Sequence, residues 1–152
     1  MDIIVILTEI VFGFLSSVGF GVITNVPRRT LMASGITGGL AWGVYVIVDQ
    51  VSGNLILPNL LAAVTIGVLA NIAAIAVRAP VNVMYVPCLV SLVPGAIIYM
   101  SMKDFTLGHD ATAQQGLIKT LTVAFALAIG FVLAEALMNQ LRPWIKRLMR
   151  RA

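Results

Sequence analysis

Two carboxyl side chains lie inside long apolar stretches of the sequence, where charge is normally avoided. Glu9 lies in the first stretch, and Glu135 lies in the last, one helical turn before Asn139. Because a charge near the centre of a membrane costs several kcal/mol, an acid at such a position is a candidate functional group. Both are therefore candidate proton-coupling residues for transport. The simpler interpretations stay open: Glu9 as an interfacial acid, and Glu135 as a side chain that reaches the interface or pairs with Arg142.

The fourth apolar stretch contains an unusual concentration of backbone-breaking residues. Pro87 and Pro94 are seven positions apart, on one face of a helix, and Gly95 follows the second. Each proline removes an N–H and frees the carbonyl of the residue four positions earlier. Freed groups persist at membrane depth only where protein, water or ligand satisfies them. We therefore expect this helix to be kinked or broken at Pro87 and at Pro94-Gly95. In the open form, the unpaired N–H groups of Gly95, Ala96 and Ile97 suit a carboxylate.

Polar residues near these prolines complete a candidate substrate site. It consists of Asn82, Tyr85, Pro87, Ser91, Pro94, Gly95 and Ala96. With Asn71 of the third stretch, these residues are candidates to line a polar path. The alternatives are ordinary interhelical hydrogen bonds, and a proline kink satisfied by Ser91 or by neighbouring helices.

No residue set typical of an enzyme or a metal site is found in the sequence. His109 stands alone, and the single cysteine, Cys88, lies in an apolar run. There is no nucleophile with a base, no metal-ligand spacing and no phosphate-binding glycine loop. The sequence therefore predicts neither catalysis nor a metal or other cofactor.

The composition predicts a membrane protein. The chain is 60% hydrophobic and 11% charged, whereas soluble domains carry about 25% charged residues, so lipid must be the outer solvent. Segments of about 20 apolar residues are long enough to span a bilayer. We expect an all-α polytopic bundle, one transmembrane domain with five spans at residues 3–24, 30–48, 58–77, 81–102 and 117–141, followed by a basic tail at 142–152.

The distribution of positive charge predicts the orientation. If the tail is cytoplasmic, eight of the ten basic residues lie inside and only Lys103 and Lys119 lie outside, as the positive-inside rule requires. The N-terminus is then outside and the C-terminus inside. The first segment has no positively charged start and is expected to be a retained helix. The net charge of +4 is interpreted as membrane anchoring, with no nucleic-acid partner.

Small residues recur at helical spacing in several spans. The helix-interface candidates are Gly35, Gly39 and Gly43 in the second span and Gly13, Ser17 and Gly21 in the first. Small side chains let helix backbones approach closely in lipid. Ordinary packing is the simpler interpretation, and a moving or intersubunit interface is the functional one. Since many secondary transporters contain two inverted repeats, a chain of five spans favours a partner.

Two stretches resemble a known family. Residues 19–31 include the loop Asn25-Val26-Pro27-Arg28-Arg29, and residues 80–102 include Val93-Pro94-Gly95. Both are similar to signatures of the small subunit of threonine/serine exporter-type transporters, although Thr24 stands where phenylalanine is expected. Their order, their spacing and the glycine-rich second span agree with this resemblance over most of the chain.

The resemblance implies one subunit of a two-component exporter in a bacterial cytoplasmic membrane. Its expected cargo is a small carboxylate, threonine and serine or succinate, and its expected partner is a larger membrane subunit related to it as an inverted repeat. A higher oligomer and coupling to the proton gradient are further expectations. The alternative is a subunit that only assembles or stabilises a complex and does not contact substrate. An intramembrane enzyme is a third, less favoured hypothesis.

Overall fold

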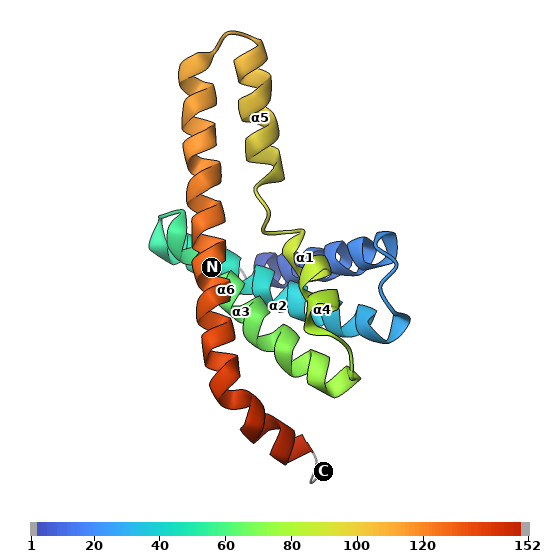
Figure 1. Ribbon diagram of the computed structural model, residues 1–152. Helices are drawn as coiled ribbons and strands as arrows, with labels where there is room; N and C mark the ends of the chain where they lie inside the picture. Colours follow the sequence, from blue (N-terminus) through green and yellow to red (C-terminus); the bar gives the residue numbers. More distant parts are fainter. Residues whose placement is uncertain (1–2, 150–152) are drawn as a thin grey trace.

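The computed structural model describes the backbone of residues 3–149 and the side chains of residues 3–141. All regular structure in this range is helical (Figure 1). The six helices are α1 (Ile3–Ile23), α2 (Arg28–Ser52), α3 (Ile56–Val77), α4 (Val81–Leu89), α5 (Gly95–Thr106) and α6 (Asp110–Met149).

Residues with left-handed or proline-restricted backbones separate the helices. Asn25 has φ 53° after α1, and Arg78 has φ 52° after α3. Gly53 has φ 57° and donates its N–H to the Asp49 carbonyl at 3.3 Å, which ends α2. Pro27 precedes α2, where its missing N–H is harmless. These short connections make successive helices neighbours.

The predicted fourth span, residues 81–102, is divided into two helices. The chain leaves helical geometry after Leu89 and re-enters it at Gly95. A break at Pro94-Gly95 is therefore confirmed, whereas α4 continues through Pro87, because the loss of one hydrogen bond does not end that short helix. At 1.5 Å per residue, α4 and α5 are about 14 and 18 Å long, each shorter than the ~30 Å hydrocarbon core.

Four helices are long and apolar enough to cross a membrane: α1, α2, α3 and residues 110–141 of α6. They correspond to four of the predicted spans. α2, α3 and α6 are longer than the apolar segments that predicted them, whereas α1 ends at Ile23, one residue before its predicted end. α2 runs four residues beyond Val48, and α6 begins at Asp110 and continues into the basic tail as far as Met149. Apolar length marks the membrane-crossing part of a helix, not the polar turns at its ends. Residues 150–152 of the tail lie outside the described residues.

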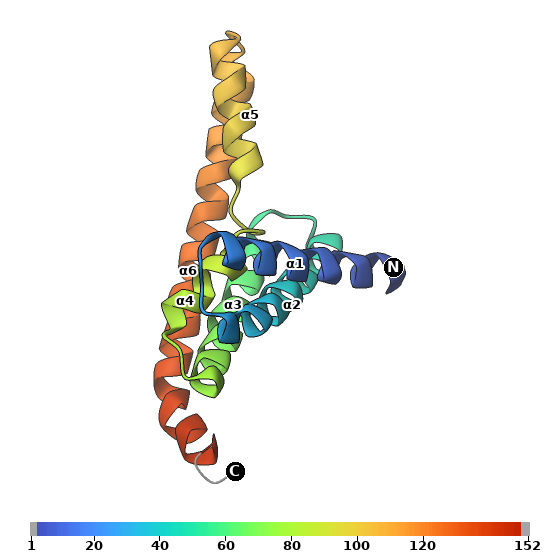
Figure 2. The ribbon, with the colours of Figure 1, turned by 90° about the vertical axis from the view of Figure 1, so that its right-hand side faces the viewer.

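The helices form two groups (Figures 1 and 2). α1, α2, α3 and α4 gather around the middle and lower part of α6, and α1 runs across α6 rather than along it. α5 lies beside the first half of α6, and together they project away from the other helices. Among the described elements, α5 packs only against α6, and α6 packs against α3 and α5.

The core is composed mainly of small side chains. Ala41, Ala62, Ala63, Ala70 and Ala74 belong to the buried cluster. Large apolar side chains are instead exposed along every helix, the reverse of a water-soluble protein, in which large exposed apolar patches are rare. Membrane helices pack through small residues and turn large ones toward lipid, so this distribution identifies a multi-pass membrane protein.

The closest packing is between α1 and α2. The predicted interface residues Gly13, Ser17 and Gly21 are buried on α1, and Gly35, Gly39 and Gly43 are buried on α2. A Cβ atom added to Gly39 would lie 2.8 Å from the backbone oxygen of Ile10. A side chain at this position would therefore push the two backbones apart.

We expect Gly39→Ala to lower the free energy of unfolding by about 1–3 kcal/mol, the usual cost of overpacking. Gly19→Ala is the matched control on α1, because a Cβ there meets nothing within 4 Å and alanine favours helix. Denaturant titration of both proteins in detergent measures the difference. Equal stability of the two variants would contradict the close approach.

Candidate functional site

The site centres on the five residues, Val90 to Pro94, that separate α4 from α5. The N–H groups of Leu92 and Val93 both bond to the Leu89 carbonyl, at 2.9 and 3.1 Å. Pro94 then turns the chain, with φ −76° and ψ 48°, and the Gly95 N–H bonds to the Val93 carbonyl at 2.7 Å. This tight three-residue turn is an inverse γ-turn, so the irregular backbone is ordered by its own hydrogen bonds.

The expectation of three unpaired N–H groups at the start of α5 is wrong for Gly95, because the γ-turn uses its N–H. The N–H of Ile98 bonds to the Pro94 carbonyl at 3.1 Å, as in a regular first turn. For Ala96 and Ile97, the described part of the chain provides no acceptor. Two donors are therefore available where the positive end of the α5 dipole lies.

A cavity of about 190 Å³ lies against this break. Its lining combines residues of the break with residues of α2, α3 and α6: Trp42, Tyr45, Leu55, Asn59, Ser91, Leu92, Val93, Pro94, Ala96, Ile97 and Val123. Pockets for drug-sized ligands are typically ~300–1,000 Å³. This cavity is smaller, so it suits a small metabolite.

Few polar groups enter the cavity, and one of them has no partner. The Ser91 hydroxyl oxygen is buried without a hydrogen bond in the described structure. The amide nitrogen of Asn59, on α3, donates to the Leu55 carbonyl at 2.8 Å. A buried hydroxyl without a partner carries a desolvation penalty. The Ser91 oxygen is covered by neighbouring atoms, so it could bond a ligand only after a local rearrangement.

An aromatic pair of α2 forms one wall of the cavity and connects it to the first intramembrane acid. The rings of Trp42 and Tyr45 stack, with centroids 4.9 Å apart and planes 11° apart. The Trp42 indole N–H donates to a Glu9 carboxylate oxygen at 2.7 Å. Glu9 is therefore bonded to a residue of the cavity wall while the acid itself lies on α1.

The second acid belongs to another polar cluster, which joins α3, α4 and α6. The amide nitrogen of Asn71 donates to the Tyr85 hydroxyl at 2.7 Å and to the Gly67 carbonyl at 2.9 Å. The Tyr85 hydroxyl donates to the Glu135 carboxylate at a longer 3.5 Å. Glu135 and Tyr85 also line an open cavity of about 370 Å³ with Phe131. The side chain of Arg142, the predicted alternative partner of Glu135, lies outside the described residues.

The predicted site residues thus fall into separate places. Ser91, Pro94 and Ala96 line the cavity at the break, and Gly95 lies beside it. Tyr85 belongs to the Glu135 cluster, and Pro87 is buried inside α4.

The family-motif loop forms its own groove at the other end of α4. Asn82 is exposed and lies in a groove with Asn25 and Pro27 of this loop. Arg28 and Arg29, which follow Pro27, are also exposed. None of these residues lines the cavity at the break.

The cavity residues that the sequence did not predict include the aromatic and polar side chains of Trp42, Tyr45 and Asn59, beside apolar ones such as Leu55 and Val123. Asn59 carried a signal, since it is a polar residue inside an apolar stretch, as Asn71 is. Trp42 and Tyr45 carried a weaker signal, because they are aromatic residues close to Gly39 and Gly43 in the second predicted span. The sequence does not show which helix faces meet, so it could not bring these residues to the break.

Among the described residues, no cluster of histidine, cysteine and acidic side chains is suited to hold a metal ion. The polar groups of the cavity, of the Glu9 contact and of the Glu135 cluster are amides, hydroxyls, an indole and two separated carboxyls. They can bind and orient a small polar molecule.

The sequence profile of the family described as "Threonine/Serine exporter, ThrE" matches residues 9–137. The chain belongs to the threonine/serine exporter family. Membership in this family, together with the apolar helices, indicates a multi-pass membrane protein.

A relative in this exporter family is described as a "Probable threonine/serine exporter" of Mycobacterium tuberculosis. It is 27% identical over 130 residues, which cover 84% of this chain and 24% of that protein. The chain therefore spans about a quarter of the relative's length. No solved structure matches the chain.

We expect Tyr85→Phe to destabilise the exporter by about 0.6 kcal/mol, and by no more than about 1.7 kcal/mol, the range measured for interhelical hydrogen bonds in a membrane protein. The change removes the hydroxyl between Asn71 and Glu135. Tyr99→Phe is the control, because Tyr99 is 68% exposed and its hydroxyl has no hydrogen bond in the described structure. Unfolding in detergent should show a loss for Tyr85→Phe alone. A loss of the same size for both would refute the bridging role of Tyr85.

Proposed function

We propose that this chain is one subunit of a two-component secondary exporter of small carboxylate metabolites, either threonine and serine or a succinate-like acid, driven by the proton gradient. Family membership supports export as the activity. The observation that carries the mechanism is the cavity at the broken helix, because it is lined by Ala96 and Ile97, whose N–H groups have no acceptor in the described structure, and by Ser91, whose buried hydroxyl has no partner there.

In this mechanism the substrate carboxylate binds at the start of α5. The N–H groups of Ala96 and Ile97 donate to its oxygens, and the Ser91 hydroxyl bonds the same group after a local rearrangement. Unpaired N–H groups at a helix start, with the helix dipole behind them, form an anion-binding site. Broken helices bind substrate in this way near the bilayer midplane of several transporter folds.

The membrane arrangement that fits this mechanism has five crossings, with α4 and α5 together forming the fourth. The N-terminus is outside and the C-terminus is in the cytoplasm, as the distribution of arginine and lysine predicts. A bacterial cytoplasmic membrane is the proposed location, consistent with the mycobacterial relative.

A larger subunit is proposed to complete the exporter. α5 packs against α6 alone among the described helices, and its outward side chains Tyr99, Met102 and Phe105 are exposed. The relative is about four times longer than the matched region, so larger proteins share this segment. In the proposed exporter, a partner subunit related as an inverted repeat covers the exposed side of these helices.

The two intramembrane acids are proposed to carry the coupling protons. Glu9 bonds to the cavity wall through Trp42, and Glu135 bonds to α4 through Tyr85. Gain or loss of a proton changes which hydrogen bonds each carboxyl can accept. Either event therefore alters a contact next to the broken helix.

A second candidate function is an assembly subunit that contacts its partner but not the substrate. The exposed apolar side of α5 and α6 favours it, because the same surface is suited to bind another membrane helix. The two functions differ in their dependence on the cavity, since only the exporter needs the break to bind substrate.

Pro94→Ala together with Gly95→Ala is expected to reduce efflux of threonine, serine or succinate at least about tenfold, because a continuous helix would use the N–H groups that bind carboxylate. The added Cβ at residue 95 meets nothing within 4 Å, so steric damage is not expected. Cells that express both subunits and are loaded with labelled substrate provide the assay, with membrane insertion measured in parallel.

Pro80→Ala is the matched control, since Pro80 precedes α4 and does not line the cavity. It should leave efflux unchanged. Wild-type efflux in the double variant, with normal insertion, would exclude the break as the binding site and favour the assembly subunit.

Glu9→Gln and Glu135→Gln test the coupling. If a carboxyl carries the proton, its amide variant should no longer export against a gradient, and a protonophore should have little further effect. Uncoupler sensitivity of efflux is the measurement. If both variants keep wild-type sensitivity, neither acid carries the coupling proton, and their roles are limited to the bonds with Trp42 and Tyr85.

A further inference from the structure

A mainly apolar cleft that also carries charged and polar side chains lies between α5 and the first part of α6, beyond the helix break. Its volume is about 640 Å³. The cleft and the cavity at the break share three lining residues, Leu55, Ala96 and Ile97. The two spaces therefore adjoin at the start of α5, so a molecule that leaves the cavity can enter the cleft there.

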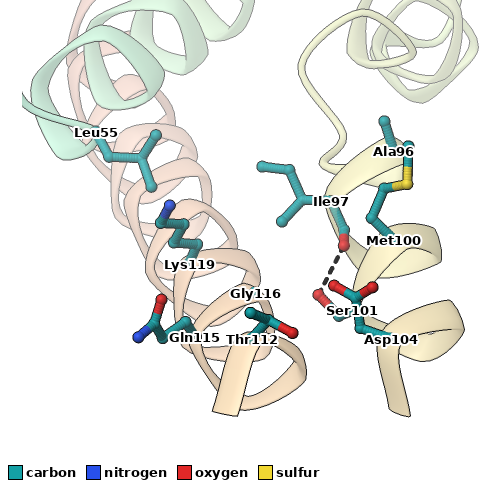
Figure 3. Close-up of a pocket in the computed structure, with 10 residues that line it drawn as sticks. All are labelled: Leu55, Ala96, Ile97, Met100, Ser101, Asp104, Thr112, Gln115, Gly116 and Lys119. Atoms are coloured by element: carbon teal, nitrogen blue, oxygen red, sulfur yellow. Dashed lines mark hydrogen bonds between the residues drawn. The ribbon is translucent and has the colours of Figure 1, made fainter. Parts of the chain in front are cut away.

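The two walls of the cleft carry opposite charges (Figure 3). Asp104 projects from α5, and Lys119 projects from α6 with its amino group directed toward Leu55, the end that adjoins the cavity. Thr112 and Gln115 add polar groups to the α6 wall. The Ser101 hydroxyl is directed to its own helix, donating to the Ile97 carbonyl at 2.7 Å.

The charged groups of the cleft are not paired. Within the described residues, neither the Asp104 carboxylate nor the Lys119 ammonium makes a hydrogen bond or ion pair. Each group faces a cleft also lined by Ile97 and Met100. In the predicted topology Asp104 lies just beyond the fourth span and Lys119 lies near the outer end of the fifth. Ionisable side chains that face a cavity between membrane helices often mark the route of a substrate. A cation and an anion that share a cleft without contacting each other can both contact a ligand that carries the two charges.

We propose that this cleft is a second binding subsite, which receives the substrate from the cavity at the break. Lys119 binds the substrate carboxylate, and Asp104 binds the ammonium group of a zwitterionic substrate. The pair thereby determines specificity, because a dicarboxylate would place a second negative charge against Asp104. This inference rests on the proposed export function. It assigns a role in substrate binding to Asp104 and Lys119, which do not line the cavity at the broken helix.

Substitutions of single charges test the assignment. In the efflux assay, Lys119→Gln should reduce export of any carboxylate substrate about tenfold, the loss expected from one charged contact. Asp104→Asn should reduce export of threonine by a similar factor but leave succinate unaffected or improved. Lys103→Gln and Asp110→Asn are matched controls: they remove the same charges from exposed residues of the same two helices, outside the cleft. Equal effects of cleft and control variants would overturn the proposal.

A labelling experiment tests the subsite without transport. Thr112→Cys places a thiol in the cleft, and Gln114→Cys places one on an exposed position of α6 outside it. The natural Cys88 is 1% exposed, so a membrane-impermeant thiol reagent should react with the new cysteines. Threonine should slow labelling of Thr112→Cys and leave that of Gln114→Cys unchanged. Loss of this protection in Lys119→Gln would identify the group that holds the ligand.

The two experiments separate the cleft from the export function. Protection by threonine in a protein that shows no efflux would support the subsite and overturn the proposed export. Efflux that depends on Pro94-Gly95, without protection and without an effect of Asp104→Asn or Lys119→Gln, would support the export function and overturn the subsite.

Discussion

The structure depends on one constraint of the bilayer: a backbone polar group at membrane depth must find a partner inside the protein. Along α1, α2 and α3 the hydrogen bonds within each helix supply these partners. The chain departs from helix between Leu89 and Gly95, and there the constraint is met only in part. The γ-turn at Pro94 satisfies Gly95, while the next two N–H groups and the Ser91 hydroxyl have no partner in the described structure. Side chains of neighbouring segments, among them Trp42, Tyr45 and Asn59, enclose this place.

Both intramembrane acids are bonded to aromatic donors. Glu9 accepts from the indole of Trp42, and Glu135 accepts from the hydroxyl of Tyr85. In each case the donor belongs to a different helix, so the bond ties two elements together as well as holding the carboxyl. An acid that is held in this way can be a structural tie and a titrating group at once. The two acids lie on different helices, α1 and α6, on either side of the broken segment in the sequence.

The sequence predicted the helices better than their contacts. Apolar length found the four long helices, because a membrane span must be long and apolar wherever it packs. It made α2 and α6 too short at both ends, since these helices continue through polar residues beyond their apolar parts. Pro94 was correctly identified as a break, since a proline next to glycine leaves little reason for helix to continue. Pro87 was not distinguished from it, because a single missing hydrogen bond is tolerated inside a helix. The convergence of Trp42, Asn59 and Val123 on the break depends on how helices rotate against each other, which spacing along one chain does not encode.

Because the helices divide into two groups, the break from Val90 to Pro94 is a candidate hinge between them. α5 moves with α6, because it packs against nothing else in the described structure, whereas α4 is held by α1, α2 and α3. Any displacement of α6 relative to α3 must therefore be absorbed by Val90 to Pro94, which covalently connect the groups. The contact between these two helices is close: the Ala63 side chain of α3 fits against Gly130 of α6, and the Ala134 side chain of α6 fits against Gly67 of α3. Because these small residues interlock, a tilt of α6 rather than a slide along α3 would be transmitted to the five residues that border the cavity.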